Sequence, residues 1–101
     1  MRKIYLIRSN DGRYKIGISK NPSKRIEQLQ TGSPDILKLV DVYESSNSSK
    51  IETALHAKYQ YCRESGEWFD MSISEEVNFL LDCKKIDKSI NLLREMGNEF
   101  I

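Results

Sequence analysis

The sequence contains few of the residues that build disulfide frameworks or zinc sites. Its 101 residues include two cysteines, Cys62 and Cys83, and one histidine, His56. The cysteines fit neither a CxxC pair nor a metal-knuckle spacing. We therefore expect two reduced thiols rather than a disulfide. A zinc site built from several His and Cys ligands is not supported.

Long apolar runs are also missing. No stretch approaches the roughly 18 residues that a membrane span needs. The first residues, 1–8, show neither a long apolar segment nor a small-residue cleavage site. We expect no signal peptide, no membrane partner and a cytoplasmic location. Hydrophobic residues form 39% of the chain and charged residues 31%, which suits a single globular domain, residues 1–101, with one modest core.

The net charge of +1 hides an uneven distribution. Residues 1–63 carry 12 Lys/Arg against 6 Asp/Glu, a net +6, whereas residues 64–101 carry 4 against 9, a net −5. The first two-thirds could present a basic surface to a phosphate backbone. A dipolar surface without a partner is the alternative, and charge alone does not decide between them.

The residue pattern predicts an α+β (α/β) fold with the element order β-β-α-β-α-α-α. Asn21-Pro22 provides an N-cap and a proline at the first helical position, and Ser72 with Glu75 forms a capping box. Residues 63–70 are expected to be a loop or short turn. The expected strands cover residues 2–8, 13–19 and 36–43, and the expected helices cover about 21–31, 48–62, a segment from Ser72, and 85–96.

Alternation of side chains sorts the first two strands into two faces. A three-residue loop with Gly12 in the left-handed position pairs residues whose numbers sum to 22, so odd residues face odd residues. The even face is a core face. The odd face carries a phenol, cations and a glycine, and Gly17 would let another backbone come close. We expect it to face phosphate, with an ordinary solvated face as the alternative; its members are Lys3, Tyr5, Ile7, Arg13, Lys15 and Gly17.

Four ordered segments together resemble the GIY-YIG nuclease domain, in the branch found in phage and bacterial proteins. Arg25 follows the glycine of the second segment by eight residues. The later Gly66-Glu67-Trp68-Phe69 is also similar to that branch. The resemblance covers about residues 2–70, the core of the expected domain. The segments are Ile4-Tyr5, Lys15-Ile16-Gly17, Pro22-x-x-Arg25 and Ile51-Glu52-x-x-Leu55-His56.

The resemblance implies a small three-stranded antiparallel sheet flanked by helices and the hydrolysis of DNA phosphodiester bonds with one divalent ion. Glu52 matches the glutamate that holds the metal, and a carboxylate suits Mg²⁺ or Mn²⁺. Arg25 matches an arginine that would grip the phosphate. Tyr5 matches a tyrosine that could act as a base if cations lower its pKa from about 10.

The nucleic-acid contacts expected from this resemblance and from the odd face are basic or small residues. Lys15 stands where many members have a second tyrosine, so we expect it to supply charge at the catalytic centre rather than a phenol. The asparagine that follows the glutamate in many members has no match, although Glu67 lies at about that distance. The expected DNA contacts are Lys3, Arg13, Lys15, Gly17, Lys24 and Arg25.

His56 lies four residues after Glu52, on the same side of a helix. It could be a catalytic hydrogen-bond partner or proton carrier at the site, or a histidine packed or solvated at the domain edge. Beyond the resemblance, a helical extension of about residues 72–98 could pack on the domain or form a homodimer face.

Three functions fit these observations. The first is a metal-dependent DNA endonuclease. The second is a nucleic-acid-binding module on the same fold that cleaves weakly or not at all, motivated by Lys15 and the missing asparagine. The third is a protein-interaction adaptor that uses the acidic C-terminal helices.

Overall fold

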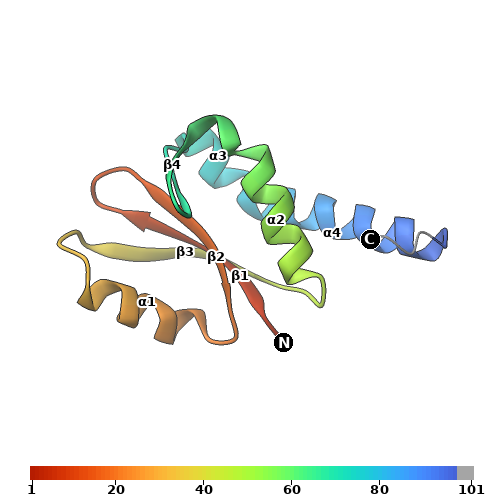
Figure 1. Cartoon of the computed structure of the whole chain (residues 1–101), viewed down its shortest axis with the longest axis horizontal. Coiled ribbons are helices and arrows are strands. Elements are labelled where there is room, and N and C mark those ends of the chain that lie inside the picture. The colour runs from red at the N-terminus through yellow and green to blue at the C-terminus, as the bar shows by residue number, and fades with distance from the viewer. Residues whose placement is uncertain (98–101) are drawn as a thin grey trace.

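The computed structural model describes residues 1–97. In this part of the chain, five antiparallel strands form one sheet in the order β3-β1-β2-β5-β4, with α helices on both faces (Figure 1). The predicted α+β class is confirmed. The elements are β1 (Lys3–Ser9), β2 (Tyr14–Ser19), α1 (Pro22–Thr31), β3 (Leu37–Glu44), α2 (Ser48–Lys58), the 3₁₀ turn η1 (Gln60–Cys62), β4 (Arg63–Ser65), β5 (Trp68–Phe69), α3 (Ile73–Val77) and α4 (Phe79–Glu95).

The first hairpin has the predicted register. Tyr5 pairs with Gly17 and Leu6 with Ile16 across β1 and β2, so odd residues do face odd residues. Gly12 has φ +94°, a left-handed conformation that glycine adopts without steric cost. β3 pairs with the other edge of β1, which places β1 at the centre of the three long strands.

The expected loop at residues 63–70 is wrong in part. β4 and β5 extend the sheet beyond β2, with Tyr14 opposite Phe69 and Lys15 opposite Trp68. Gly66, at φ +56°, turns the chain between them. Strands of two or three residues are too short to show side-chain alternation in a sequence. The sheet therefore has two short strands more than predicted, and they carry residue 67 to the edge of β2.

The main core lies on the even face of the hairpin, between the sheet and the helices α2 and α4. This is the predicted core face. Phe69 from β5 is fully buried in it. Its buried members are Ile4, Leu6, Tyr14, Ile16, Ile51, Leu55, Tyr59, Phe69, Met71, Phe79, Cys83 and Ile90.

The odd face is not the open phosphate-facing surface that the pattern predicts. Helix α1 lies across it (Figure 1), and Tyr5 and Ile7 are buried there. Ile26 and Leu29 of α1 pack against them in a second, smaller core. The apolar stripe of α1 needs a partner surface, and the odd face supplies it. The odd face was expected to be open because strand alternation alone does not show that a helix packs on it.

The helix starts are largely as predicted. The Asn21 side chain accepts a hydrogen bond from the Lys24 amide at 3.2 Å, and Pro22 begins α1. The capping box of Ser72 and Glu75 is present at α3. The expected helix 48–62 is shorter, because α2 ends at Lys58 and a 3₁₀ turn follows.

The boundary between the two C-terminal helices lies at a different residue from the one predicted. α3 ends at Val77, and α4 runs unbroken from Phe79 to Glu95, through the point where two helices were expected to be joined. Asn78 is the residue between α3 and α4. The expected limit of this extension, about residue 98, lies outside the described residues.

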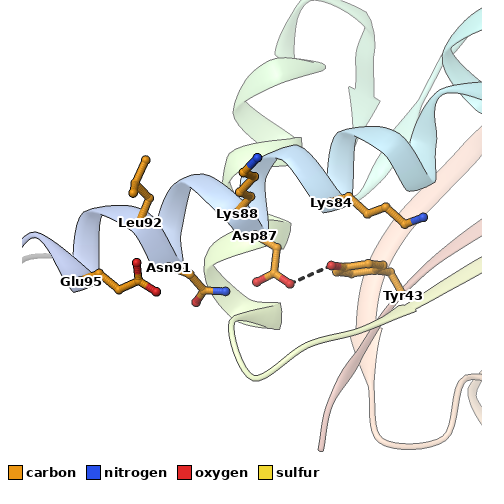
Figure 2. Close-up of a pocket in the computed structure, with 7 residues that line it drawn as sticks. All are labelled: Tyr43, Lys84, Asp87, Lys88, Asn91, Leu92 and Glu95. Atoms are coloured by element: carbon orange, nitrogen blue, oxygen red, sulfur yellow. Dashed lines mark hydrogen bonds between the residues drawn. The ribbon is translucent and has the colours of Figure 1, made fainter.

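Helix α4 is anchored to the sheet through one carboxylate. Asp87 accepts hydrogen bonds from the Tyr43 hydroxyl at 2.7 Å, the Ser45 hydroxyl at 2.8 Å and the Asn47 amide at 2.8 Å. Figure 2 shows Asp87 directed from α4 toward Tyr43, in a shallow pocket beside the helix. These bonds fasten the middle of α4 to the end of β3 and the start of α2.

The last turns of α4 extend past the sheet (Figure 1), with Leu92 and Met96 exposed. A homodimer through these helices stays a prediction. Cys62 and Cys83 are free thiols, as expected. Within residues 1–97, no helix has the length and apolar character to cross a membrane.

Candidate functional site

The side chain of Tyr5 crosses over Gly17 on the neighbouring strand. A Cβ atom at residue 17 would lie 2.3 Å from the Tyr5 Oη and 2.5 Å from its Cζ, far inside van der Waals contact. Gly17 is therefore the residue that leaves room for the phenol. We expected the missing side chain to admit another backbone, whereas it admits the ring of its own cross-strand partner.

Burial raises the pKa of Tyr5 above 10, and this effect outweighs the hydrogen bond and the charge of Arg25, which lower it. The nearby carboxylates Glu67 and Glu52 raise it further. Arg25 thus lowers the pKa of this phenol as expected of a nearby cation, but the net pKa, which the proposed base role needs below 10, is raised. At neutral pH the Tyr5 hydroxyl keeps its proton.

Arg25 lies on α1, one turn after the N-cap, and it is exposed. Its guanidinium lies near enough to the Tyr5 phenol to lower the pKa of that group, and it donates a hydrogen bond to Gln28 Oε1 at 3.4 Å. The exposed Arg25 guanidinium is accessible to a phosphate group, which it could bind through two N–H groups. The structure thus brings Tyr5 and Arg25 together, as the resemblance implies.

Three further side chains form a cluster next to this pair. Glu52 and His56 come from α2 and Glu67 from the β4–β5 turn, and one ligand atom of each lies within 4.8 Å of the other two. We call Glu52, His56 and Glu67 the acidic cluster. Its donors are two carboxylates and an imidazole, which suit a divalent cation.

The electrostatics of Glu52 agree with a cation site. Burial and then the charge of Glu67 raise the pKa of Glu52, and the influence of His56, Lys15 and Arg2 only partly offsets this. Two half-buried carboxylates this close repel each other, and a bound cation would relieve the repulsion. The residues present therefore fit the divalent ion that the resemblance implies.

One residue of β2 positions two members of the cluster. The Ile16 carbonyl lies 2.9 Å from Nε2 of His56, and the Ile16 amide donates to the Glu67 carbonyl at 3.3 Å. The His56 ring also packs edge-on against Phe69, with ring centroids 5.1 Å apart. His56 is therefore half-buried and packed beside the site, as the alternative of a packed histidine describes, and its catalytic role stays a prediction.

Lys15 lies beside the acidic cluster but is 8% exposed. Its ammonium pairs with Glu67 Oε2 at 2.8 Å and lies 5.6 Å from the centre of the Trp68 ring. Lys15 therefore supplies charge at the site, as we expected. The surface-facing position expected for it as a DNA contact is wrong, because β5 and Trp68 cover it.

The remaining expected DNA contacts are spread over the surface and partly engaged. Lys3 lies 4.0 Å from Glu44. Arg13 pairs with Asp11 at 2.7 Å and stacks over Trp68 at 5.1 Å. Gly17 is buried under Tyr5, so it does not lie at the surface. Lys24 and Arg25 are consecutive residues of α1 and both are exposed, so they are the expected contacts most accessible to a phosphate backbone.

Sequence reasoning identified Glu52 and His56 but did not assign Glu67 to the site. Its signal was present, since Glu67 stands at about the distance of the asparagine that follows the glutamate in many GIY-YIG members. The residue type differed, and the short strands that bring it to β2 were not predicted.

The fold and the acidic cluster define a small α+β domain with a candidate divalent-metal site beside a tyrosine–arginine pair. The chain belongs to the T5orf172 domain family, whose model matches residues 3–92. No curated protein and no solved structure matches the sequence significantly.

Proposed function

We propose that this protein is a divalent-metal-dependent endonuclease that hydrolyses DNA phosphodiester bonds, related to the GIY-YIG nucleases. The observation that carries the proposal is the convergence of Tyr5, Arg25 and the acidic cluster at one place on the domain. Membership of the T5orf172 domain family and the ordered GIY-YIG-like segments support the same reading. A cytoplasmic location belongs to this proposal as well.

Each residue has a role that its position allows. Arg25 binds two oxygens of the scissile phosphate through its fork and stabilises the charge that develops there. The Tyr5 oxygen orients the attacking water, and its ionised form accepts the water proton as the new P–O bond forms. The P–O bond to one sugar oxygen breaks in the same displacement, and that oxygen leaves and takes up a proton from water. The acidic cluster would hold a divalent ion, and that ion would supply Lewis-acid polarisation of the phosphate and offset charge on the leaving oxygen. Lys15 holds Glu67 in place.

A cleavage assay tests the proposal. Supercoiled plasmid, linear duplex and single-stranded DNA are incubated with the protein in Mg²⁺, in Mn²⁺ or in chelator. We expect cleavage of at least one substrate with metal and none with chelator. Intact DNA under every condition, from a protein whose fold is verified by circular dichroism, would contradict a nuclease function.

The second candidate is a nucleic-acid-binding module that cleaves weakly or not at all. The observations that favour it are Lys15 in place of a second tyrosine and the raised pKa of Tyr5, since burial reduces the fraction of this phenol that is ionised and able to accept a proton. This candidate predicts salt-sensitive DNA binding without metal-dependent cleavage. In a binding titration, Lys24→Gln should weaken the affinity and reduce its salt dependence, whereas the distant Lys84→Gln should not.

An adaptor that uses the acidic C-terminal helices is the third candidate. It predicts no DNA binding even at low salt, so the same titration separates it from both nucleic-acid functions.

A further inference from the structure

We propose that Glu52, His56 and Glu67 together bind one divalent ion, and that His56 makes this site prefer a transition metal such as Mn²⁺ over Mg²⁺. The biological use of this ion rests on the proposed nuclease function, but its binding is measurable without DNA. The proposal adds two ligands to the single glutamate implied by the resemblance and assigns the site a metal preference.

The three ligands lie on two different segments of the fold. Glu52 and His56 are four residues apart on α2, so their side chains project from the same face of the helix. Glu67 approaches from the β4–β5 turn, and all three donor atoms lie within 4.8 Å of one another. One cation between them would be within reach of all three side chains after small rotamer changes.

The tautomer of His56 leaves one nitrogen available. Nε2 lies 2.9 Å from the Ile16 carbonyl, which can only accept, so Nε2 carries the proton and donates it. In the neutral ring the lone pair is then on Nδ1. A histidine ligand in metal sites commonly donates its other ring N–H to a backbone carbonyl, which fixes the ring and strengthens the ligand. His56 has this partner.

The Ile16 backbone fixes the third ligand as well. Its amide donates to the Glu67 carbonyl at 3.3 Å, and Lys15, the residue before it, pairs with the Glu67 carboxylate at 2.8 Å. The contacts that hold Glu67 and His56 are thus made by two consecutive residues of β2. A side chain that is held in position before binding loses less conformational entropy when it takes up an ion.

The charge of the site suits a divalent ion. Two carboxylates face one another at the site; Lys15 pairs with Glu67, and Lys15 and Arg2 offset the effect of burial and of the Glu67 charge on the pKa of Glu52 only in part. The nitrogen donor decides the preference, because imidazole suits transition metals, whereas Mg²⁺ prefers all-oxygen ligands and water.

Metal titration of the whole protein without DNA tests the inference. Binding of Mn²⁺ is followed by the loss of the electron paramagnetic resonance signal of free Mn²⁺, and Mg²⁺ affinity is measured by competition. The variants are His56→Gln, whose amide can still donate to the Ile16 carbonyl, and Glu67→Gln. The control is Glu64→Gln, an exposed carboxylate in β4 of the same hairpin, 3.9 Å from Arg13.

We expect the wild type to bind one Mn²⁺ more tightly than Mg²⁺. Because loss of even an indirect partner of a metal ligand weakens affinity by about 10–100-fold, Glu67→Gln should weaken Mn²⁺ binding by at least about tenfold. His56→Gln should reduce the ratio of Mn²⁺ to Mg²⁺ affinity, and Glu64→Gln should change neither quantity.

Two results overturn the inference. One is an affinity ratio in His56→Gln equal to that of the wild type. The other is Mn²⁺ binding that is unaffected by Glu67→Gln or is equally weakened by Glu64→Gln. The outcomes are separable from the nuclease proposal. Metal binding as predicted with no DNA cleavage would reject the proposed function alone, and cleavage with metal binding insensitive to both ligand variants would reject this inference alone.

Discussion

The contact between Tyr5 and Gly17 shows how one residue type is fixed by its neighbour rather than by its own conformation. Gly17 lies in a regular strand and does not need a left-handed backbone; the glycines with positive φ among the described residues are Gly12, Gly66 and Gly97. What it provides is the space that a Cβ would take from the phenol. The position of the Tyr5 phenol, a proposed catalytic group, therefore depends on the absence of a Cβ atom at residue 17.

Replacement of Gly17 by alanine should destabilise the protein. The added Cβ would lie 2.3 Å from Tyr5 Oη, and overpacking of this kind costs about 1–3 kcal/mol in the free energy of unfolding. Urea denaturation measures this cost. Gly32→Ala is the matched control, since its Cβ meets nothing within 4 Å and its φ is −95°. A cost for Gly17→Ala that persists in a Tyr5→Ala background would show that the clash with Tyr5 is not its cause.

The pH dependence of cleavage should reveal whether Tyr5 is the base. Because its pKa is raised above 10 by burial, its ionised fraction increases about tenfold per pH unit below that value. We therefore expect the single-turnover cleavage rate to rise with pH between about 7 and 9, and Tyr5→Phe to be slow and to lose this slope. A wild-type rate that is flat over this range, or a variant that keeps the slope, would remove Tyr5 from the role of base.

The second core, between α1 and the odd face of the hairpin, was not predicted because it depends on how two secondary-structure elements pack together. Helix α1 and the hairpin each have one apolar surface in the sequence, and Ile26 and Leu29 form the apolar stripe of that helix. The sheet face that this stripe covers depends on contacts between residues far apart in the sequence. A local pattern does not predict such contacts. Tyr5 on the odd face is buried as a result. Local patterns predicted both elements correctly but did not predict their contact.

Asp87 should contribute strongly to the attachment of α4. Burial by itself would raise its pKa, but hydrogen bonds from Asn47, Tyr43 and Ser45 together hold the pKa below 3.8. Such charge-assisted bonds contribute about 1.5–3 kcal/mol each when their full context is intact. Asp87→Asn should therefore lower the free energy of unfolding near pH 7 by about 1–3 kcal/mol, as measured by urea denaturation.

The sign of the pH effect follows from the lowered pKa. A carboxyl group with a folded pKa below its unfolded value stabilises the fold above the unfolded pKa, and this contribution is lost as pH falls through the folded value. The stability gap between wild type and Asp87→Asn should be largest near neutral pH and shrink below about pH 4. The exposed Asp70→Asn serves as control. A gap that is constant from pH 7 to pH 3 would contradict the role assigned to the Asp87 charge.

At the scale of the whole molecule, the sequence predicted the three long strands, the starts of α1, α2 and α3 and the hairpin register, because caps, turns and alternation are local signals. It also predicted the meeting of Tyr5, Arg25 and Glu52, through the family resemblance. The short strands β4 and β5 were not predicted, since strands of two or three residues leave no periodic signal. Glu67 was not assigned to the site for the same reason, and the burial of Tyr5 required the position of α1.

The central claim is that this domain cleaves DNA with a metal ion bound at Glu52. The most direct test compares plasmid cleavage in Mn²⁺ by the wild type, by Glu52→Gln and by Glu95→Gln, a control at the exposed end of α4, after circular dichroism confirms equal folding. We predict cleavage by the wild type and by the control, and a loss of at least about a hundredfold in Glu52→Gln, as expected when a metal ligand is removed. Equal cleavage by Glu52→Gln and the wild type would contradict the claim.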